Sequence, residues 1–355
     1  MTRSRPNPSE MTQTDRPLVV IVDSSDERDV ETDLLGVLAD VRAYAARDEA
    51  ELPAEIDGAA GLMVRSGIRL TARTIERLTR CRVIVRAGVG FDNVDGAAAG
   101  RAGIPLLNVP DYGTNEVADH TLALLLAAWR RLGTYNDALR ADPVAGWRYD
   151  GAGPLRRLTG ATLGIAGLGR IGTAVALRAK AFGLRVVYYD PFREDGYDKA
   201  YQVERAPSLE AVVRQSDALS LHAPLTAETE GIVDAALLAQ AKPGLVLVNA
   251  GRGKLVSLDA VYDALRSGLV RAFAADVLEA EPPDPHHPLL AAFARREPWL
   301  EGRLILTPHA AFYSEESLHE VRTKACELLR RALRGEPLAN CVNKAFLVHA
   351  RTPVL

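Results

Sequence analysis

The chain has 355 residues, of which 48% are hydrophobic and 25% charged, a balance typical of soluble globular proteins with two domains of ordinary size. The formal net charge of −3 gives no electrostatic basis for binding nucleic acid or an anionic membrane. The three cysteines lack CxxC spacing, so we expect a reducing, cytoplasmic location, with no disulfide framework and no metal site.

The N-terminal part of the chain has the pattern of a parallel α/β sheet. Residues 1–16 are polar and lack an apolar run, so we expect a disordered tail there and no signal peptide. Four short apolar runs then alternate with helix-like or polar stretches, as strands and helices do around a parallel sheet. These candidate strands span residues 18–23, 61–65, 82–86 and 104–107.

A long helix is expected next, from about Thr114 to Arg131. Its most apolar stretch, residues 121–129, is too short to span a bilayer, so we interpret it as a buried helix and assign no membrane role. A polar stretch rich in glycine and proline at residues 141–160 then interrupts the pattern, as a connection between elements does.

Six further candidate strands follow, with helical patterns in most of the gaps between them. They span residues 161–167, 185–190, 217–222, 244–249, 271–276 and 303–307. Six strands of this kind predict a doubly wound parallel sheet. An amphipathic helix is expected over residues 314–334, with Ser314 as its N-cap and two glutamates in its first turn. We expect this helix to return to the first domain.

The stretch GIAGLGRIG lies between the first strand of this second group and an alanine-rich helix, and it places glycines at 167, 169 and 172. In a dinucleotide-binding turn, the first glycine permits the tight turn, the second lets the backbone approach a pyrophosphate, and the third lets helix and strand pack closely. The N–H groups at the helix N-terminus then face the phosphates. Taken alone, the pattern is equally typical of an ordinary turn.

Asp190 favours the dinucleotide interpretation. It ends the next strand, 18 positions beyond Gly172, close to where an acidic side chain binds the adenosine ribose hydroxyls. Because a carboxylate there repels a 2′-phosphate, the sequence predicts NAD rather than NADP as cofactor. Arg193 is the one nearby residue that weakens this preference.

Polar residues follow the remaining strands of the second group in turn. His222 follows the third strand and Arg252 the fourth, Asp276 and Glu281 follow the fifth, and His309 follows the sixth. Ligands of doubly wound sheets bind beyond the carboxyl ends of the strands, so a shared site explains this series better than coincidence. Each residue also has a structural alternative, as a surface arginine, a solvated loop acid, a turn cap or a packed loop histidine.

These motifs, in this order, resemble those of the D-isomer-specific 2-hydroxyacid dehydrogenases over residues 18–343. The resemblance rests on VRAGVGFDNVD, GLGRIG, YYDPF, HAPLT, VNAGRGKLV, AADVLEAEP and TPHAAFYSEES. FDNVD and HAAFYSEES are most similar to the C-terminal binding protein branch, whereas VRSG and RAGVG are equally similar to phosphoglycerate dehydrogenases.

The resemblance implies an α/β protein of two domains, with an NAD-binding Rossmann domain inserted in a flavodoxin-like substrate domain. We expect the substrate domain at residues 17–116 and 309–355, and the Rossmann domain at residues 117–308. The resemblance further implies a homodimer that uses NADH to reduce a small 2-oxo acid to an (R)-2-hydroxy acid.

The resemblance also implies the roles of individual residues. Arg252, Glu281 and His309 would form the catalytic set, and Asp276 would bind the nicotinamide carboxamide. The residues expected to bind the cofactor are Gly167, Gly169, Arg170, Ile171, Gly172, Asp190, His222, Pro224, Ala250 and Asp276. Those expected to bind the substrate are Arg65, Ser66, Arg86, Val89, Gly90 and Phe312.

Two departures from the family pattern bear on this site. Phe312 stands where C-terminal binding proteins usually have tryptophan, so the pocket is expected to differ in shape. The interval from Glu281 to His309 is several residues longer than in the family. The insertion at residues 286–302 could form a lid or a contact surface, and we expect the simpler alternative, a longer surface loop.

Two other functions are compatible with the same fold. A redox-sensing regulatory protein, like the corepressors among the C-terminal binding proteins, would bind NADH without needing a proton donor, so the Arg252, Glu281 and His309 set favours an enzyme. A formate dehydrogenase of this family transfers no proton to its substrate, so Glu281 argues against that activity.

Overall fold

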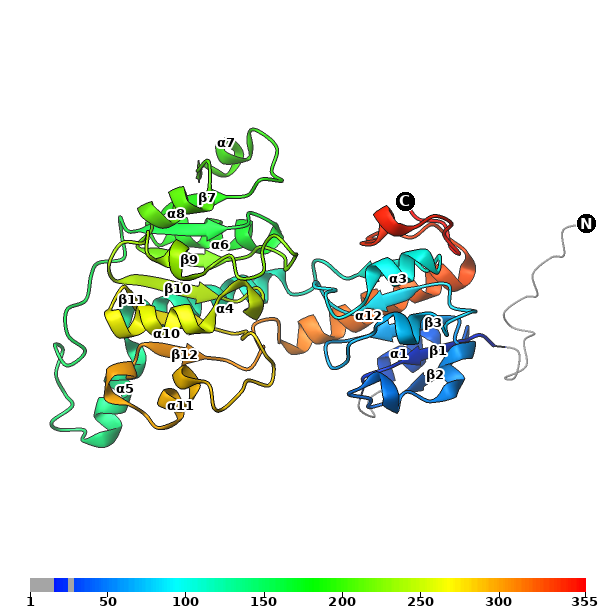
Figure 1. Cartoon of the computed structure of the whole chain (residues 1–355), viewed down its shortest axis with the longest axis horizontal. Helices are drawn as coiled ribbons and strands as arrows, with labels where there is room; N and C mark the ends of the chain where they lie inside the picture. Colours follow the sequence, from blue (N-terminus) through cyan, green and yellow to red (C-terminus); the bar gives the residue numbers. More distant parts are fainter. Residues whose placement is uncertain (1–15, 25–28) are drawn as a thin grey trace, which may run out of the picture. The chain divides into compact units, whose positions relative to one another are not determined.

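The computed structural model describes residues 16–24 and 29–355, which divide into two compact units (Figure 1). The first unit contains Met1–Tyr112 and Ser314–Leu355, and the second contains Gly113–Tyr313. Both divisions fall at the N-cap of a helix, a few residues from the expected boundaries at 116/117 and 308/309. The disordered tail expected over residues 1–16 lies outside the described residues, apart from Arg16.

The first unit is built on a five-stranded parallel sheet with the order β2-β1-β3-β4-β5, which is the flavodoxin-like order. Its strands are β1 (Leu18–Ile21), β2 (Asp40–Ala43), β3 (Gly61–Val64), β4 (Ile84–Arg86) and β5 (Leu106–Asn108). The four predicted strands are confirmed. β2 has no counterpart among them, because its sequence DVRA has no apolar run and none of its residues is fully buried.

Helices cover both faces of this sheet, and in Figure 1 the orange-to-red C-terminal segment lies with the blue and cyan N-terminal elements. The helices are α1 (Asp29–Leu35), α2 (Ala72–Ile75), α3 (Gly96–Arg101) and α12 (Glu315–Arg334), with short 3-10 helices η3 (Glu49–Glu51), η4 (Ala54–Gly58) and η7 (Lys344–Phe346). The predicted N-cap of α12 is confirmed, since Ser314 and Ser317 form a reciprocal capping box.

A buried ion pair joins α1 to α12. The Glu31 side chain has no exposed surface, and Arg322 donates to its two carboxylate oxygens at 3.0 and 2.6 Å. Arg65 donates a third bond to Glu31 at 3.2 Å. Burial opposes the charged carboxylate, but the hydrogen bond and charge of Arg322 outweigh it, so the pKa of Glu31 lies below its ordinary value.

The second unit is built on a seven-stranded parallel sheet with the order β12-β11-β10-β9-β6-β7-β8. The strands are β6 (Thr162–Ala166), β7 (Arg185–Tyr189), β8 (Glu204–Arg205), β9 (Ala218–Leu221), β10 (Leu245–Asn249), β11 (Val270–Ala275) and β12 (Leu304–Leu306). The doubly wound prediction and its six strands are confirmed. The seventh strand, β8, has only two residues, both exposed, and gives no periodic signal.

The two faces of this sheet have separate cores. Val246 and Val248 of β10 pack in the core that contains α4 (Thr114–Arg130) and α6 (Arg170–Ala181). Leu245 and Leu247 pack in the opposite core, which contains α8 (Leu209–Gln215), α9 (Ala235–Leu238), α10 (Leu258–Ser267) and α11 (Pro288–Ala294). Strand order reverses between β6 and β9, which is where such sheets bind their ligands.

The predicted buried helix is confirmed as α4, in which Leu122, Leu125 and Trp129 are almost fully buried. No helix in the described part of the chain has the length and apolar character needed to cross a membrane. The helices α5 (Leu132–Ala141) and α7 (Tyr197–Tyr201) have no fully buried residue, although Tyr201 of α7 packs against the core that contains α4 and α6.

The prediction of a surface loop at residues 286–302 is wrong. This segment forms α11 and the 3-10 helix η6 (Pro298–Leu300), and it buries Leu289 and Leu300 in the core beside α10. The prolines and charged residues around it suggested a loop, but Pro288 stands in the first turn of α11, where its missing N–H is tolerated.

We predict that Arg322→Met lowers the free energy of unfolding by about 3–5 kcal/mol at pH 7, because it leaves a buried carboxylate without its main partner. Urea denaturation measures this change. The loss should shrink as the pH falls. In the variant, burial raises the pKa of Glu31 above its ordinary value of 4.5, so the carboxylate becomes neutral before that pH is reached, whereas the wild type loses its ion-pair stabilisation only as the pH falls below 4.5.

The double variant Glu31→Leu with Arg322→Met serves as the control, because it removes both charges together. It should recover most of the lost stability. A single Arg322→Met variant that unfolds within about 1 kcal/mol of the wild type would show that this pair does not stabilise the α1–α12 contact.

Candidate active site

Of the three glycines in the turn after β6, Gly167 and Gly172 are required by close contacts within the fold, whereas Gly169 is not. A Cβ on Gly172 would lie 2.1 Å from the Gly167 carbonyl oxygen, and one on Gly167, whose φ is +92°, would lie 2.8 Å from the Ala223 nitrogen. Gly169 has an ordinary φ of −71°, and its Cβ would meet no atom nearer than Nη2 of Arg193 at 3.7 Å. The space beside Gly169 therefore suits close approach by a ligand.

Asp190 follows β7 and fixes the glycine turn. Its Oδ2 accepts the backbone N–H of Leu168 at 2.8 Å, between the first two glycines, and its Oδ1 accepts that of Phe192 at 2.9 Å. Arg193 also lies close, with Nε 3.3 Å from Oδ2. The sequence predicts that Asp190 binds the ribose hydroxyls. It contains no pattern that predicts the hydrogen bond between Asp190 and Leu168.

His222 follows β9 and is half-buried. Its Nε2 lies 2.8 Å from the Ser220 hydroxyl, and Nδ1 is buried with no hydrogen-bond partner among the described residues. Burial lowers the pKa of His222 to about 4. The ring is therefore uncharged near neutral pH, so His222 does not have the properties of a proton donor there.

The other residues expected around the cofactor lie on the same edge of the sheet. Arg170 and Ile171 form the first turn of α6, and Pro224 lies in the loop after β9. Ala250 follows β10 and is almost fully buried against Val117 of α4.

Arg252 lies in a tightly constrained turn after β10. Asn249, which is fully buried, donates from Nδ2 to the Arg252 carbonyl at 2.9 Å, and the guanidinium donates to the Gly251 carbonyl at 2.9 Å. A Cβ on Gly253 would lie 1.8 Å from the Leu278 carbonyl oxygen, so only glycine fits there. Asn249 is a positioning residue of the turn that sequence patterns do not single out.

His309 and Glu281 come together as a hydrogen-bonded pair. Nδ1 of His309 lies 2.6 Å from Oε2 of Glu281, and Oε1 of Glu281 accepts the Leu278 N–H at 3.2 Å. An ionised carboxylate only accepts hydrogen bonds, so Nδ1 carries the hydrogen in this contact, and Nε2 is the ring nitrogen that does not face Glu281. The ring of Phe312 meets the imidazole edge-on, with centroids 6.2 Å apart.

Asp276 follows β11 and is 3% exposed. Its Oδ1 accepts from the Thr307 hydroxyl at 2.5 Å and from the Ala310 N–H at 2.8 Å, and its Oδ2 accepts from the Ala311 N–H at 2.9 Å. The carboxylate therefore binds the loop that contains His309, a contact that the sequence does not reveal.

The residues expected on the substrate side, apart from Phe312, belong to the first unit. They are Arg65 and Ser66 after β3, Arg86 at the end of β4, and Val89 and Gly90 just beyond it. The Arg65 N–H donates to Asp23 at 2.7 Å, and the Val89 carbonyl accepts from Asn108 at 2.7 Å. All five lie at the carboxyl edge of their sheet.

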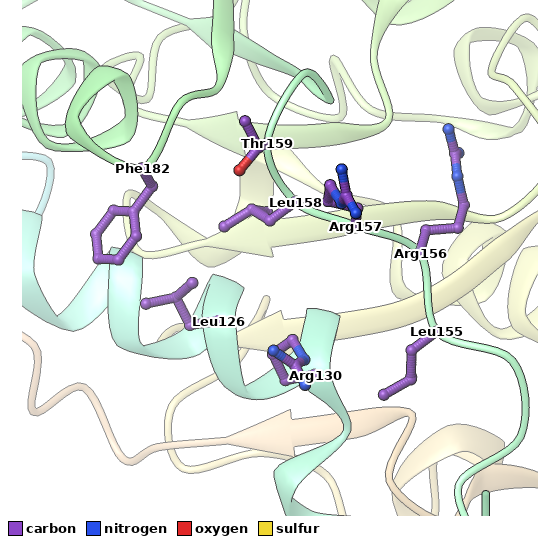
Figure 2. Close-up of a pocket in the computed structure, with 8 residues that line it drawn as sticks. All are labelled: Leu126, Arg130, Leu155, Arg156, Arg157, Leu158, Thr159 and Phe182. Carbon is purple, nitrogen blue, oxygen red and sulfur yellow. The ribbon is translucent and has the colours of Figure 1, made fainter.

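A cavity of about 490 Å³ lies elsewhere in the second unit and contains none of the expected site residues. Figure 2 shows its lining, which is formed by Leu126 and Arg130 of α4, the extended segment Leu155–Thr159, and Phe182. Phe182 follows the C-terminus of α6, whereas the glycine turn precedes its N-terminus, so the cavity belongs to the opposite edge of the sheet. Among the described residues, no group of three or more His, Cys, Asp or Glu side chains could hold a metal ion.

Comparison with known proteins identifies the family. The family model described as "D-isomer specific 2-hydroxyacid dehydrogenase, NAD binding domain" matches residues 122–311, more than half of the chain. The chain belongs to this family. Its second unit corresponds to the NAD-binding domain of this family, with the Rossmann strand order that the sequence predicts.

Two curated relatives represent the two expected branches. C-terminal-binding protein 1 of Caenorhabditis elegans is 34% identical over 350 residues, covering 96% of this chain and 46% of the relative. D-3-phosphoglycerate dehydrogenase of Methanocaldococcus jannaschii is 36% identical over 310 residues, covering 87% of this chain and 56% of the relative. The chain therefore spans about half the length of these relatives.

Solved structures of similar length share the fold. D-lactate dehydrogenase from Aquifex aeolicus, complexed with NAD and lactic acid, has a TM-score of 0.79 at 28% identity, covering 90% of this chain and 96% of its own. A glyoxylate reductase from Paecilomyes thermophila has a TM-score of 0.80 at 27% identity, covering 90% of this chain and 97% of its own.

Proposed function

We propose that this protein is an NAD-dependent D-2-hydroxyacid dehydrogenase that interconverts a small 2-oxo acid and an (R)-2-hydroxy acid. The observation that supports it most is the 2.6 Å contact between His309 and Glu281, in the same domain as the glycine turn. Binding NADH requires no such pair, whereas reducing a carbonyl requires a proton donor. The solved D-lactate dehydrogenase and glyoxylate reductase of similar fold support this reaction class.

The bound cofactor would supply the hydride, and the chain's own residues would hold it. The glycine turn and the first turn of α6, with Arg170 and Ile171, would bind the pyrophosphate, and Asp190 would bind the adenosine ribose. His222, Pro224 and Ala250 would line the remaining cofactor surface. Oδ2 of Asp276 accepts one backbone N–H, which leaves it an acceptor position for the nicotinamide carboxamide.

Two residues would act on the reacting carbonyl. Arg252 would bind the substrate carboxylate with its planar guanidinium and stand near the carbonyl oxygen, where negative charge develops during reduction. His309 would give its Nε2 proton to that oxygen and take it back in oxidation, while Glu281 holds the ring by Nδ1. Arg65, Ser66, Arg86, Val89, Gly90 and Phe312 would then contact the rest of the substrate, which makes the first unit the substrate domain.

We further infer a cytoplasmic homodimer, and the exposed aromatic residues beyond α5 support the association. Trp147 is 80% exposed and Tyr149 is 94% exposed, and large apolar side chains grouped on a surface are typical of protein interfaces. Sedimentation equilibrium tests this, and a monomer at micromolar concentration would contradict it.

A regulatory NADH sensor is the second candidate, because C-terminal-binding protein 1 is a relative over nearly the whole of this chain. A panel of 2-oxo acids, followed by NADH absorbance, separates the two functions. Turnover of a panel member supports the dehydrogenase. Tight NADH binding without turnover across the panel favours the sensor.

Cofactor preference should depend on Asp190. We predict that Asp190→Ala lowers kcat/KM with NADH at least about tenfold, because hydrogen bonds to a charged group contribute about 1.5–3 kcal/mol. The ratio of NADPH to NADH activity should rise, since Arg193, now 3.3 Å from that carboxylate, could then meet a 2′-phosphate. Asp195→Ala, in the same loop, is the control and should leave the ratio unchanged. A wild type that uses both cofactors equally would contradict this role.

Turnover should depend on His309. We predict that His309→Gln lowers kcat in both directions by roughly 10²–10⁴, the usual contribution of a positioned acid–base group. The dissociation constant of NADH, measured by fluorescence, should change by only a few-fold. His319→Gln, on exposed surface of α12, is the control and should behave as the wild type. Turnover by His309→Gln within a few-fold of the wild type would exclude His309 as the proton donor.

A further inference from the structure

His309 is held in a backbone conformation that a non-glycine residue adopts only under constraint. Its φ is +54°, in the left-handed region that residues other than glycine adopt only rarely. Most of the constraint comes from Asp276: the His309 N–H donates to the Asp276 carbonyl at 2.8 Å, and the N–H groups of Ala310 and Ala311 donate to the Asp276 carboxylate at 2.8 and 2.9 Å. The His309 N–H also donates to the Thr307 carbonyl at 3.1 Å. The orientation of Asp276 therefore determines where the imidazole lies.

A chain of hydrogen bonds fixes that carboxylate in turn. The Thr307 hydroxyl donates to Asp276 Oδ1 at 2.5 Å, and Nε2 of His120 lies 2.9 Å from the same hydroxyl oxygen. The carboxylate can only accept, so the single hydroxyl hydrogen of Thr307 is used on Asp276. The hydroxyl oxygen must then accept from His120, which defines Nε2 of His120 as a donor. The direction of each bond from His120 to Asp276 is thus determined.

The three side chains come from three elements of the second unit. His120 lies on α4 and is 26% exposed, Thr307 follows β12, and Asp276 follows β11 with 1% of its side chain exposed. Such a chain can hold a nearly buried carboxylate in one orientation, because rotation of its plane would break the bonds to Thr307, Ala310 and Ala311 together.

We propose that His120 and Thr307 are positioning residues for the proton donor: they fix the Asp276 carboxylate, which fixes the backbone of His309. This inference rests on the proposed role of His309. According to this inference, His120 on the long helix α4 influences the reaction through Thr307 and Asp276, without contacting substrate or cofactor itself. Thr307 and His120 would then act on the rate of the proton-coupled step more than on binding of the 2-oxo acid.

The first experiment compares Thr307→Val with Thr307→Ser. Valine keeps the shape and removes the hydroxyl, so we expect kcat to fall roughly 10- to 100-fold, because a displacement of about 1 Å at a reacting group can cost that much. KM for the 2-oxo acid should change by less than about threefold, in contrast to the kcat effect. NADH affinity is not used as a criterion, because Asp276 is also the proposed acceptor for the nicotinamide carboxamide. Serine retains the hydroxyl and should restore kcat to within a few-fold of the wild type.

The second experiment makes the same comparison at His120, which lies at the other end of this series of hydrogen bonds. The amide nitrogen of glutamine can take the place of Nε2 as a donor, so His120→Gln should retain activity and His120→Leu should lose it as Thr307→Val does. Melting temperatures show whether each variant is folded. A folded Thr307→Val enzyme with kcat within threefold of the wild type, or a Thr307→Ser enzyme as impaired as Thr307→Val, overturns the proposal.

One readout does not depend on turnover, which separates failure of this inference from failure of the proposed function. If the wild type reduces no 2-oxo acid, the proposed function fails, but the ring resonances of His309 can still be observed by NMR after labelling with ¹³C-histidine. His309→Gln identifies these resonances by their loss. We expect them to shift or broaden in Thr307→Val and to remain in place in Thr307→Ser. Unchanged His309 resonances in Thr307→Val would overturn the inference on their own.

Discussion

One interaction recurs at three places in this protein: an aspartate just beyond a strand accepts backbone N–H groups from the loop that follows the neighbouring parallel strand. Asp23, beyond β1, accepts from Arg65 and Gly67 after β3. Asp190, beyond β7, accepts from Leu168 after β6, and Asp276, beyond β11, accepts from the loop after β12. Each pair of strands is adjacent in its sheet.

The reason lies in parallel pairing. Neighbouring parallel strands end at the same edge of the sheet. In the loops that begin there, the backbone N–H groups no longer have a hydrogen-bond partner in an adjacent strand. A short acidic side chain at the end of the next strand can satisfy these groups without a longer loop. The residues expected to perform the chemistry lie in or beside these loops, so the contacts that complete the hydrogen bonding of the fold also set the geometry of the candidate site.

The sequence was sufficient to predict those features that depend on local pattern. Apolar runs located the main strands, and the glycine turn with Asp190 indicated a dinucleotide-binding domain, in agreement with the family match. The strand β8 was missed because two exposed residues show no periodicity. The helix α11 was mistaken for a loop because prolines and charges flank its short apolar segment, and only packing against α10 gives that segment a core to enter.

The residues that orient Asp276, namely Thr307 and His120, could not be predicted from local sequence patterns. Asp276 attracts attention as a polar residue at a strand end, but the contacts of Thr307 and His120 join positions 187 residues apart in the chain. His120 gives no signal of its own, because a histidine on a mostly apolar helix is usually a packed residue. Such contacts depend on the three-dimensional register of α4 against β11 and β12, which a periodic pattern does not determine.

The backbone of His309 bears on the choice between enzyme and sensor. A left-handed conformation at a non-glycine residue requires surrounding contacts that enforce it. Among the described residues with this conformation, His309 is the one that belongs to the candidate site, whereas Arg131 and Gln202 end helices. A sensor that only binds NADH needs the glycine turn and the acid at the end of β7. Neither requires a constrained histidine after β12, five strands later in the chain. The constraint at His309, the bond to Glu281 and the donors converging on Asp276 all serve to orient one imidazole. Orienting an imidazole matters most where a proton must move along a defined direction, so this arrangement supports catalysis over sensing.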